Sequence, residues 1–200
     1  MTTVRGRARH PGTTSPRPPL QEPCDAGRVP GPSSSSPEDV LHQPLARQFE
    51  SFLDEHRAML SACLDGLTEE QARRRLVPSQ TTLLGLVKHA TFVERVWFEE
   101  AVTGRGRAET GLPPGPAESF ALHPDDTVAR VRRDHLAACA DSRRATAGLG
   151  LDDLLPGNRR GPLPLRWVYL HVLRELAQHC GHADVLREQL LAPGATSAAP

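Results

Sequence analysis

Residues 163–191 read LPLRWVYLHVLRELAQHCGHADVLREQLL, and this stretch decides the fold. Its apolar residues recur at spacings of three and four, a pattern that predicts one long helix. A proline is tolerated in the first turn of a helix, so Pro164 is compatible with a start at Leu163. A helix of this length can form one side of a helical bundle.

Four polar residues of this predicted helix fall on one stripe. With about 100° of rotation per residue, Glu175, His179 and His182 lie about 40°, 80° and 20° from His171. Glu175 and His179 are four residues apart, so their side chains are neighbours on the helix surface. A carboxylate and an imidazole at this spacing can share one metal ion such as zinc or nickel. The alternative is that the stripe forms the polar face of a surface helix.

Three further segments show helical periodicity, namely residues 44–64, 81–102 and 125–147. The run Thr-Glu-Glu-Gln at residues 68–71 has the form of a capping box and predicts a short extra helix. Residues 104–122 are rich in glycine and proline and are predicted to form a long loop. No segment has the alternating pattern of a strand. The chain is therefore predicted to be all-α, with its four long helices packed as a four-helix bundle.

The second long helix supplies a third candidate metal ligand. It is apolar around much of its girth, which predicts deep burial, and His89 is its only histidine. Together with Glu175 and His179, His89 would leave coordination positions open for water or substrate, as in catalytic metal sites. His171 or His182 would then orient a ligand or move a proton. The alternative for His89 is a core histidine with one hydrogen-bond partner.

Composition narrows the class of protein. The chain has 24 basic and 24 acidic residues, a balance that argues against a general nucleic-acid binder. No apolar run approaches the length that spans a bilayer. The four cysteines are far apart and form no CxxC pair, which indicates reduced thiols and a cytoplasmic location. Residues 1–36 are predicted to be a disordered tail and residues 192–200 a flexible tail, so the bundle would occupy residues 40–191.

Two motifs resemble those of a known family. Residues 83–89 (LLGLVKH) and residues 179–188 (HCGHADVLRE), in this order, resemble the DinB-like superfamily, in the branch named after actinobacterial mini-circle proteins. The resemblance covers residues 42–190 and implies an up-down-down-up bundle. It also implies a metal site with one histidine from the second helix and two ligands four residues apart on the last helix.

Those ligand positions correspond here to His89, Glu175 and His179. Many DinB-like proteins have histidine at the position of Glu175, whereas the mycothiol-dependent maleylpyruvate isomerases have glutamate there, so the difference does not abolish the site. His182 stands where many relatives carry glutamine or aspartate, which makes it a neighbour of the ligands or an alternative ligand. Trp97 and Trp167 are interpreted as core or rim aromatics.

Some members of the superfamily are transferases or isomerases that use a low-molecular-weight thiol such as mycothiol. The resemblance implies the same here, with a divalent metal, zinc or nickel, as cofactor and mycothiol as co-substrate. A metal ion favours this chemistry because it lowers the pKa of a bound thiol or water. Two alternatives remain open. One is a non-catalytic, stress-associated protein that binds a metal or ligand and contacts a partner. The other is a structural homodimer of metal-free bundles.

Overall fold

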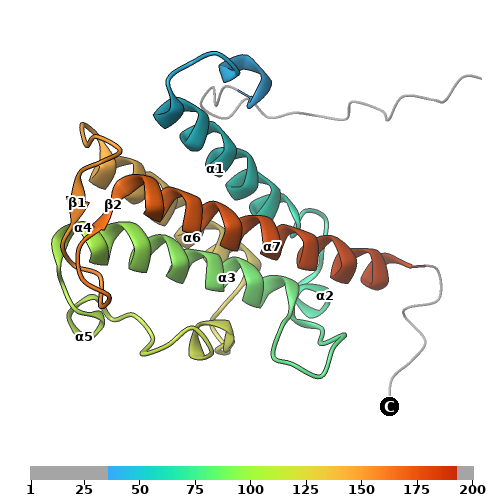
Figure 1. Ribbon diagram of the computed structural model, residues 1–200. Coiled ribbons are helices and arrows are strands. Elements are labelled where there is room, and N and C mark those ends of the chain that lie inside the picture. Colours follow the sequence, from blue (N-terminus) through green and yellow to red (C-terminus); the bar gives the residue numbers. More distant parts are fainter. Residues whose placement is uncertain (1–35, 193–200) are drawn as a thin grey trace, which may run out of the picture. The chain divides into compact units, whose positions relative to one another are not determined.

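The computed structural model describes residues 36–192, so the two predicted tails lie outside the described residues apart from Ser36 and Ala192. Helices dominate these residues, which confirms the all-helical prediction (Figure 1). The long helices are α1 (Leu45–Ala62), α3 (Leu83–Glu94), α6 (Val128–Thr146) and α7 (Leu165–Leu191). The short elements are η1 (Glu38–Val40), α2 (Glu69–Arg73), η2 (Arg95–Glu100), α4 (Ala101–Thr103), α5 (Arg107–Thr110) and η3 (Glu118–Phe120).

The four long helices pack in an up-down-down-up arrangement. α1 and α7 run in the same direction, because Arg187 near the end of α7 donates to the carbonyl of Asp65 just beyond α1, at 2.8 Å. Arg132 near the start of α6 pairs with the Asp65 carboxylate at 2.7 Å, so α6 runs opposite to α1. α3 runs opposite to α7 and in the same direction as α6 (Figure 1). This is the topology that the family resemblance implies.

The predicted second helix is continuous but not uniform. α3 passes into η2, a π-helical stretch, and then into α4, before Gly104 ends the helix with a φ of 71°. A π-helical turn carries hydrogen bonds between residues five apart and is frequent at functional sites. The apolar periodicity did not predict this irregularity. It changes the direction in which Trp97, within η2, presents its side chain relative to a regular α-helix.

The N-terminal ends of the helices differ slightly from prediction. The capping box at Thr68 and Gln71 is present as predicted. α6 begins after Thr127, whose side chain caps it, rather than at residue 125 or 126. Asp126 instead pairs with Lys88 of α3, at 2.6 Å between Nζ and Oδ2. The partly buried Lys88 thus pairs with a carboxylate that could otherwise cap the helix, and such a long-range contact leaves no local signal in the sequence.

The prediction that the chain contains no strand is wrong in one place. β1 (Leu154–Leu155) and β2 (Leu163–Pro164) form a short antiparallel pair. α7 therefore starts at Leu165, and Pro164 precedes the helix instead of lying in its first turn. A pair of two-residue strands is too short to show alternation. The turn between β1 and β2 lies at the end of the bundle beside α4 (Figure 1).

The core lies where the four long helices meet. Its largest fully buried side chains are Leu53, Leu60, Leu64, Leu84, Leu86, Phe98, Leu165 and Leu176. Most of them come from α1, α3 and α7, whose apolar residues recur at helical spacing. In the part of the chain that the structure describes, no helix is long and apolar enough to span a membrane.

Candidate metal centre

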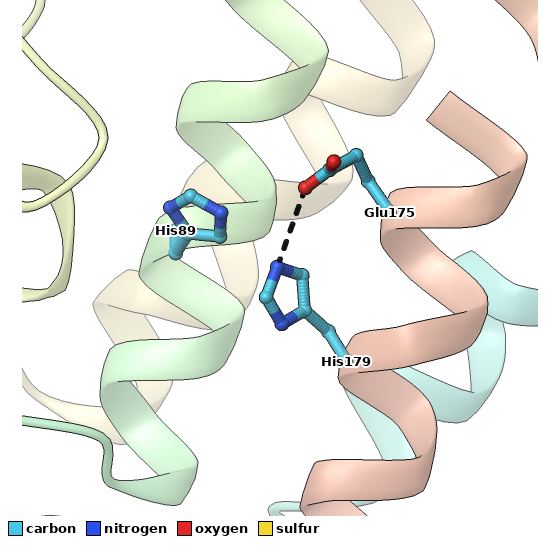
Figure 2. Close-up of side chains that lie close together, drawn as sticks. All are labelled: His89, Glu175 and His179. Atoms are coloured by element: carbon cyan, nitrogen blue, oxygen red, sulfur yellow. Dashed lines mark ion pairs between the residues drawn. The ribbon is translucent and has the colours of Figure 1, made fainter. Parts of the chain in front are cut away.

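Three side chains that can bind a metal converge between α3 and α7. His89 lies on α3, and Glu175 and His179 lie one turn apart on α7 (Figure 2). One ligand atom from each of the three lies within 4.8 Å of the others. His179 Nε2 and Glu175 Oε2 are 3.7 Å apart, which is too long for a hydrogen bond. The structure thus brings together the three residues that the sequence singled out, with an ion-pair contact but no hydrogen bond between Glu175 and His179 (Figure 2).

Ser119 of η3 determines how the His89 ring presents its nitrogens. The Ser119 hydroxyl donates its only proton to the carbonyl of Pro116 at 2.6 Å. Its Oγ must therefore accept from His89 Nδ1, also at 2.6 Å. The proton then resides on Nδ1, and Nε2 keeps a free lone pair. Figure 2 shows one ring nitrogen of His89 facing Glu175 and His179. Metal-binding histidines are commonly oriented by such a contact at the other nitrogen.

The surroundings keep the two imidazoles neutral. Phe120 stacks on His89 with ring centroids 4.0 Å apart, and the His179 ring meets His89 edge-on at 4.7 Å. Burial, together with the neighbouring His179, lowers the pKa of His89 to about 3. Burial also lowers the pKa of His179, although the Glu175 carboxylate opposes this effect. Both rings therefore have lone pairs available at neutral pH, as metal ligands require.

The His179 nitrogens provide a test of whether a metal fits. Nδ1 and Nε2 are both buried, and neither has a hydrogen-bond partner among residues 36–192. Buried polar atoms in native proteins are almost always paired, so an orphaned pair of nitrogens needs an explanation. A divalent ion beside His89, Glu175 and His179 would supply the partner. The donor set of two imidazoles and one carboxylate is typical of zinc and related ions and leaves coordination positions open.

The two predicted catalytic histidines lie in different environments. His171 lies against Trp97 at 4.0 Å and stacks on Trp167 at 5.1 Å between ring centroids. Its Nε2 is 3.9 Å from Glu175 Oε1. His182 is exposed, and its ring centroid is 5.8 Å from that of His179. His182 is not among the three converging donors.

A cleft of about 230 Å³ opens beside His89 and Glu175, two of the three donors. α3 and η2 contribute apolar side chains to its lining, and the segment between α4 and α6 and the turn between β1 and β2 contribute the rest together with α7. Its lining includes His89, Phe92, Val96, Trp97, Glu100, Arg107, Pro114, Pro116, Asn158, Arg159, Arg160, His171 and Glu175. His89 and Glu175 are therefore accessible to a small molecule from this side.

Sequence reasoning missed several residues of this centre. Ser119 and Phe120 lie in the predicted loop, and the only signal for them was the unusual length of that loop. Trp97 packs against the core, as predicted, and it also lines the cleft. The sequence did not indicate that Trp97 and Trp167 flank His171.

Cys180 contacts the His56 carbonyl at 3.6 Å, and burial raises the pKa of its thiol to about 11, so it is poorly suited as a nucleophile.

Comparison with known families decides the relationship. Residues 48–192 match the model of the family described as mycothiol-S-transferase. The chain belongs to the mycothiol-S-transferase family. The match contains all three metal-binding candidates and the whole cleft, and it confirms the resemblance to DinB-like proteins. A comparison with curated proteins gave no match. Membership in this family implies a mycothiol-type thiol as one substrate.

Proposed function

We propose that this protein is a metal-dependent S-transferase that joins a mycothiol-type thiol to a small electrophile. His89, Glu175 and His179 would hold the divalent ion. The observation that carries the proposal is the pair of buried His179 nitrogens, which have no hydrogen-bond partner and lie beside two further ligand atoms. Family membership supports the reaction type.

The chain itself would orient and shield the reacting groups. Ser119 keeps the free lone pair of His89 directed at the centre, and Phe120 covers the ring. A divalent ion in such a site lowers the pKa of a thiol that binds to it, so that the nucleophilic thiolate exists at neutral pH. The apolar wall of Phe92 and Val96 excludes water from one side of the cleft.

His171 has the geometry of a residue that orients Glu175. Arg174 donates to His171 Nδ1 at 3.1 Å, so the ring proton lies on Nε2, the atom that faces Glu175 Oε1. The distance of 3.9 Å between these two atoms is beyond hydrogen-bond range, and Arg174 itself donates to Glu175 Oε1 at 3.5 Å. We propose that His171 helps to orient Glu175 through Arg174, which contacts both side chains. His182 lies outside the cleft lining, and we propose that it acts only through its neighbour His179.

The donor set also indicates which metal ion the site would hold. Two nitrogens and one carboxylate oxygen suit zinc, and nickel accepts the same ligands. We propose zinc or nickel as the natural ion. Metal analysis of protein purified from the native host would distinguish them.

The first experiment measures metal content by mass spectrometry in untagged protein and in the His89→Ala and His179→Ala variants. We expect a single zinc or nickel ion per chain in the wild type and its loss in both variants, with helicity by circular dichroism retained. His42→Ala, an exposed histidine outside the centre, should keep the ion. Failure of the wild type to take up zinc, nickel or manganese would refute the metal site.

The second experiment tests the reaction. Metal-loaded protein is mixed with mycothiol and monochlorobimane, and we expect a carbon–sulfur bond to form as chloride leaves, with fluorescence reporting the product. His89→Ala should abolish the enzymatic rate. A metal-loaded protein that gives no turnover with mycothiol or related thiols would show that the site binds a metal without acting as a transferase.

A further inference from the structure

The far end of the cleft carries positive charge that the protein does not neutralise. Arg159 and Arg160 both line the cleft, and no carboxylate of the described residues pairs with either guanidinium. Arg107 lines the cleft as well, but Glu100 pairs with it at 3.1 Å and the Pro114 carbonyl accepts from it at 2.6 Å. Two of the three arginines therefore keep their hydrogen-bonding capacity for a ligand.

Arg160 is held in place by aromatic rings instead of an anion. Its guanidinium lies 5.7 Å from the Trp97 ring centroid and 5.9 Å from that of Trp167. Such cation–π contacts orient an arginine while leaving its N–H groups free for a planar, bidentate acceptor. Carboxylates have that geometry.

The turn that carries the two arginines is built to stay beside the cleft. The Gly157 amide donates to the Ala101 carbonyl at 2.8 Å. A Cβ at Gly157 would collide with the carbonyl oxygen of Glu100, so only glycine lets the turn approach the end of α4 this closely. Within the turn, the buried Asn158 side chain accepts from the Arg160 amide at 3.0 Å.

The cleft that holds the arginines also has an apolar lining. Phe92, Val96 and Trp97 line the cleft together with the arginines and with His89 and Glu175. We infer that the cleft takes an electrophilic acceptor with an apolar body and a carboxylate, which Arg159 and Arg160 bind. The reference to an electrophile rests on the proposed transferase function. Binding of the carboxylate by the arginines does not need the metal.

Tryptophan fluorescence can report on ligand binding beside Arg160. The chain's two tryptophans are Trp97 and Trp167, and both contact Arg160. Quenching of tryptophan fluorescence therefore reports directly on occupancy of this end of the cleft. The probes are 4-nitrobenzoate and its uncharged analogue 4-nitrobenzamide, titrated into the full-length protein after metal removal with a chelator. We expect the carboxylate to bind about tenfold more tightly than the amide, because a charge-assisted hydrogen bond is lost with the amide.

Variants assign the preference to the arginines. Arg159→Gln combined with Arg160→Gln should remove the preference while leaving affinity for 4-nitrobenzamide unchanged. Gly157→Ala should weaken the preference with both arginines still present, since the turn must move. Arg133→Gln, on the exposed face of α6, is the matched control and should behave as wild type.

Two results would overturn the inference. One is equal binding of the two probes by the wild-type protein. The other is a carboxylate preference that appears only when metal is added and persists in the double arginine variant, because the anion would then bind the ion. Conversely, a preference that the arginines control in a protein that takes up no metal would support this inference and refute the proposed metal-dependent function alone.

Discussion

His89 Nδ1 donates a hydrogen bond to the Ser119 hydroxyl at a distance of 2.6 Å. The two residues are 30 positions apart, and Ser119 is 1 % exposed. Gly85 favours this close packing, because an ideal Cβ there would lie 3.1 Å from the Phe120 carbonyl oxygen, a tight approach. η3 can therefore pack directly on α3 beside the metal-binding candidates. The loop between α4 and α6 is in this way part of the candidate site.

Ser119→Ala should weaken metal binding. Without the hydroxyl, the His89 ring loses its orientation and its tautomer, and loss of such a partner typically lowers metal affinity by about 10- to 100-fold. Competition with a chromogenic zinc chelator measures the change. The matched control is Ser142→Ala, which removes the buried hydroxyl of a serine on α6. An unchanged zinc affinity in Ser119→Ala would show that the contact does not tune the site.

Replacing His179 should separate metal binding from stability. His179→Leu removes two buried nitrogens that have no hydrogen-bond partner in the described structure, so the metal-free variant should be more stable than metal-free wild type by about 1 kcal/mol. Urea unfolding in the presence of a chelator measures this. With zinc added, the order should reverse, because only the wild type gains stability from the ion. A metal-free variant that is clearly less stable than wild type would contradict this account of the orphaned nitrogens.

Arg57 and Glu94 form a buried ion pair in the core. Arg57 Nε and Nη2 donate to the two carboxylate oxygens of Glu94 at 2.8 and 2.7 Å, and Glu94 is 0 % exposed. Arg57→Met should destabilise the protein by about 3–5 kcal/mol, because it leaves an unpaired charge in the core. Arg57→Met with Glu94→Met should recover most of that loss, and guanidinium unfolding measures both. A double variant as unstable as the single one would show that the pair itself, and not the orphaned charge, dominates.

Acid should destabilise the fold partly through His135. This side chain is fully buried on α6, and burial is the main cause that lowers its pKa from the ordinary value of 6.5. Below pH 6.5, His135 becomes protonated in the unfolded chain but stays neutral in the folded chain. The contribution to stability is therefore complete above pH 6.5 and is lost as the pH falls through the lowered pKa.

The test compares urea unfolding across this pH range for metal-free wild type and His135→Gln. The variant should show a smaller loss of unfolding free energy on acidification, with His42→Gln as the exposed control. Equal pH dependence in wild type and His135→Gln would rule out His135 as a contributor.

The sequence by itself determined the helices and the relation between Glu175 and His179. Their spacing of four places them on one face of any α-helix, whatever surrounds it. The strongly apolar second helix also had to be buried, and its single histidine made His89 the third candidate. These conclusions depend on local geometry and burial, both of which periodicity records.

Only the tertiary structure decided how the site is completed. Ser119 reaches His89 because η3 packs on α3, and Arg160 reaches Trp97 because Gly157 lets a turn approach the end of α4. These contacts join segments far apart in the chain. Helix periodicity contains information about neighbours within a turn or two, whereas the path of a loop depends on which side chains pack across the whole fold.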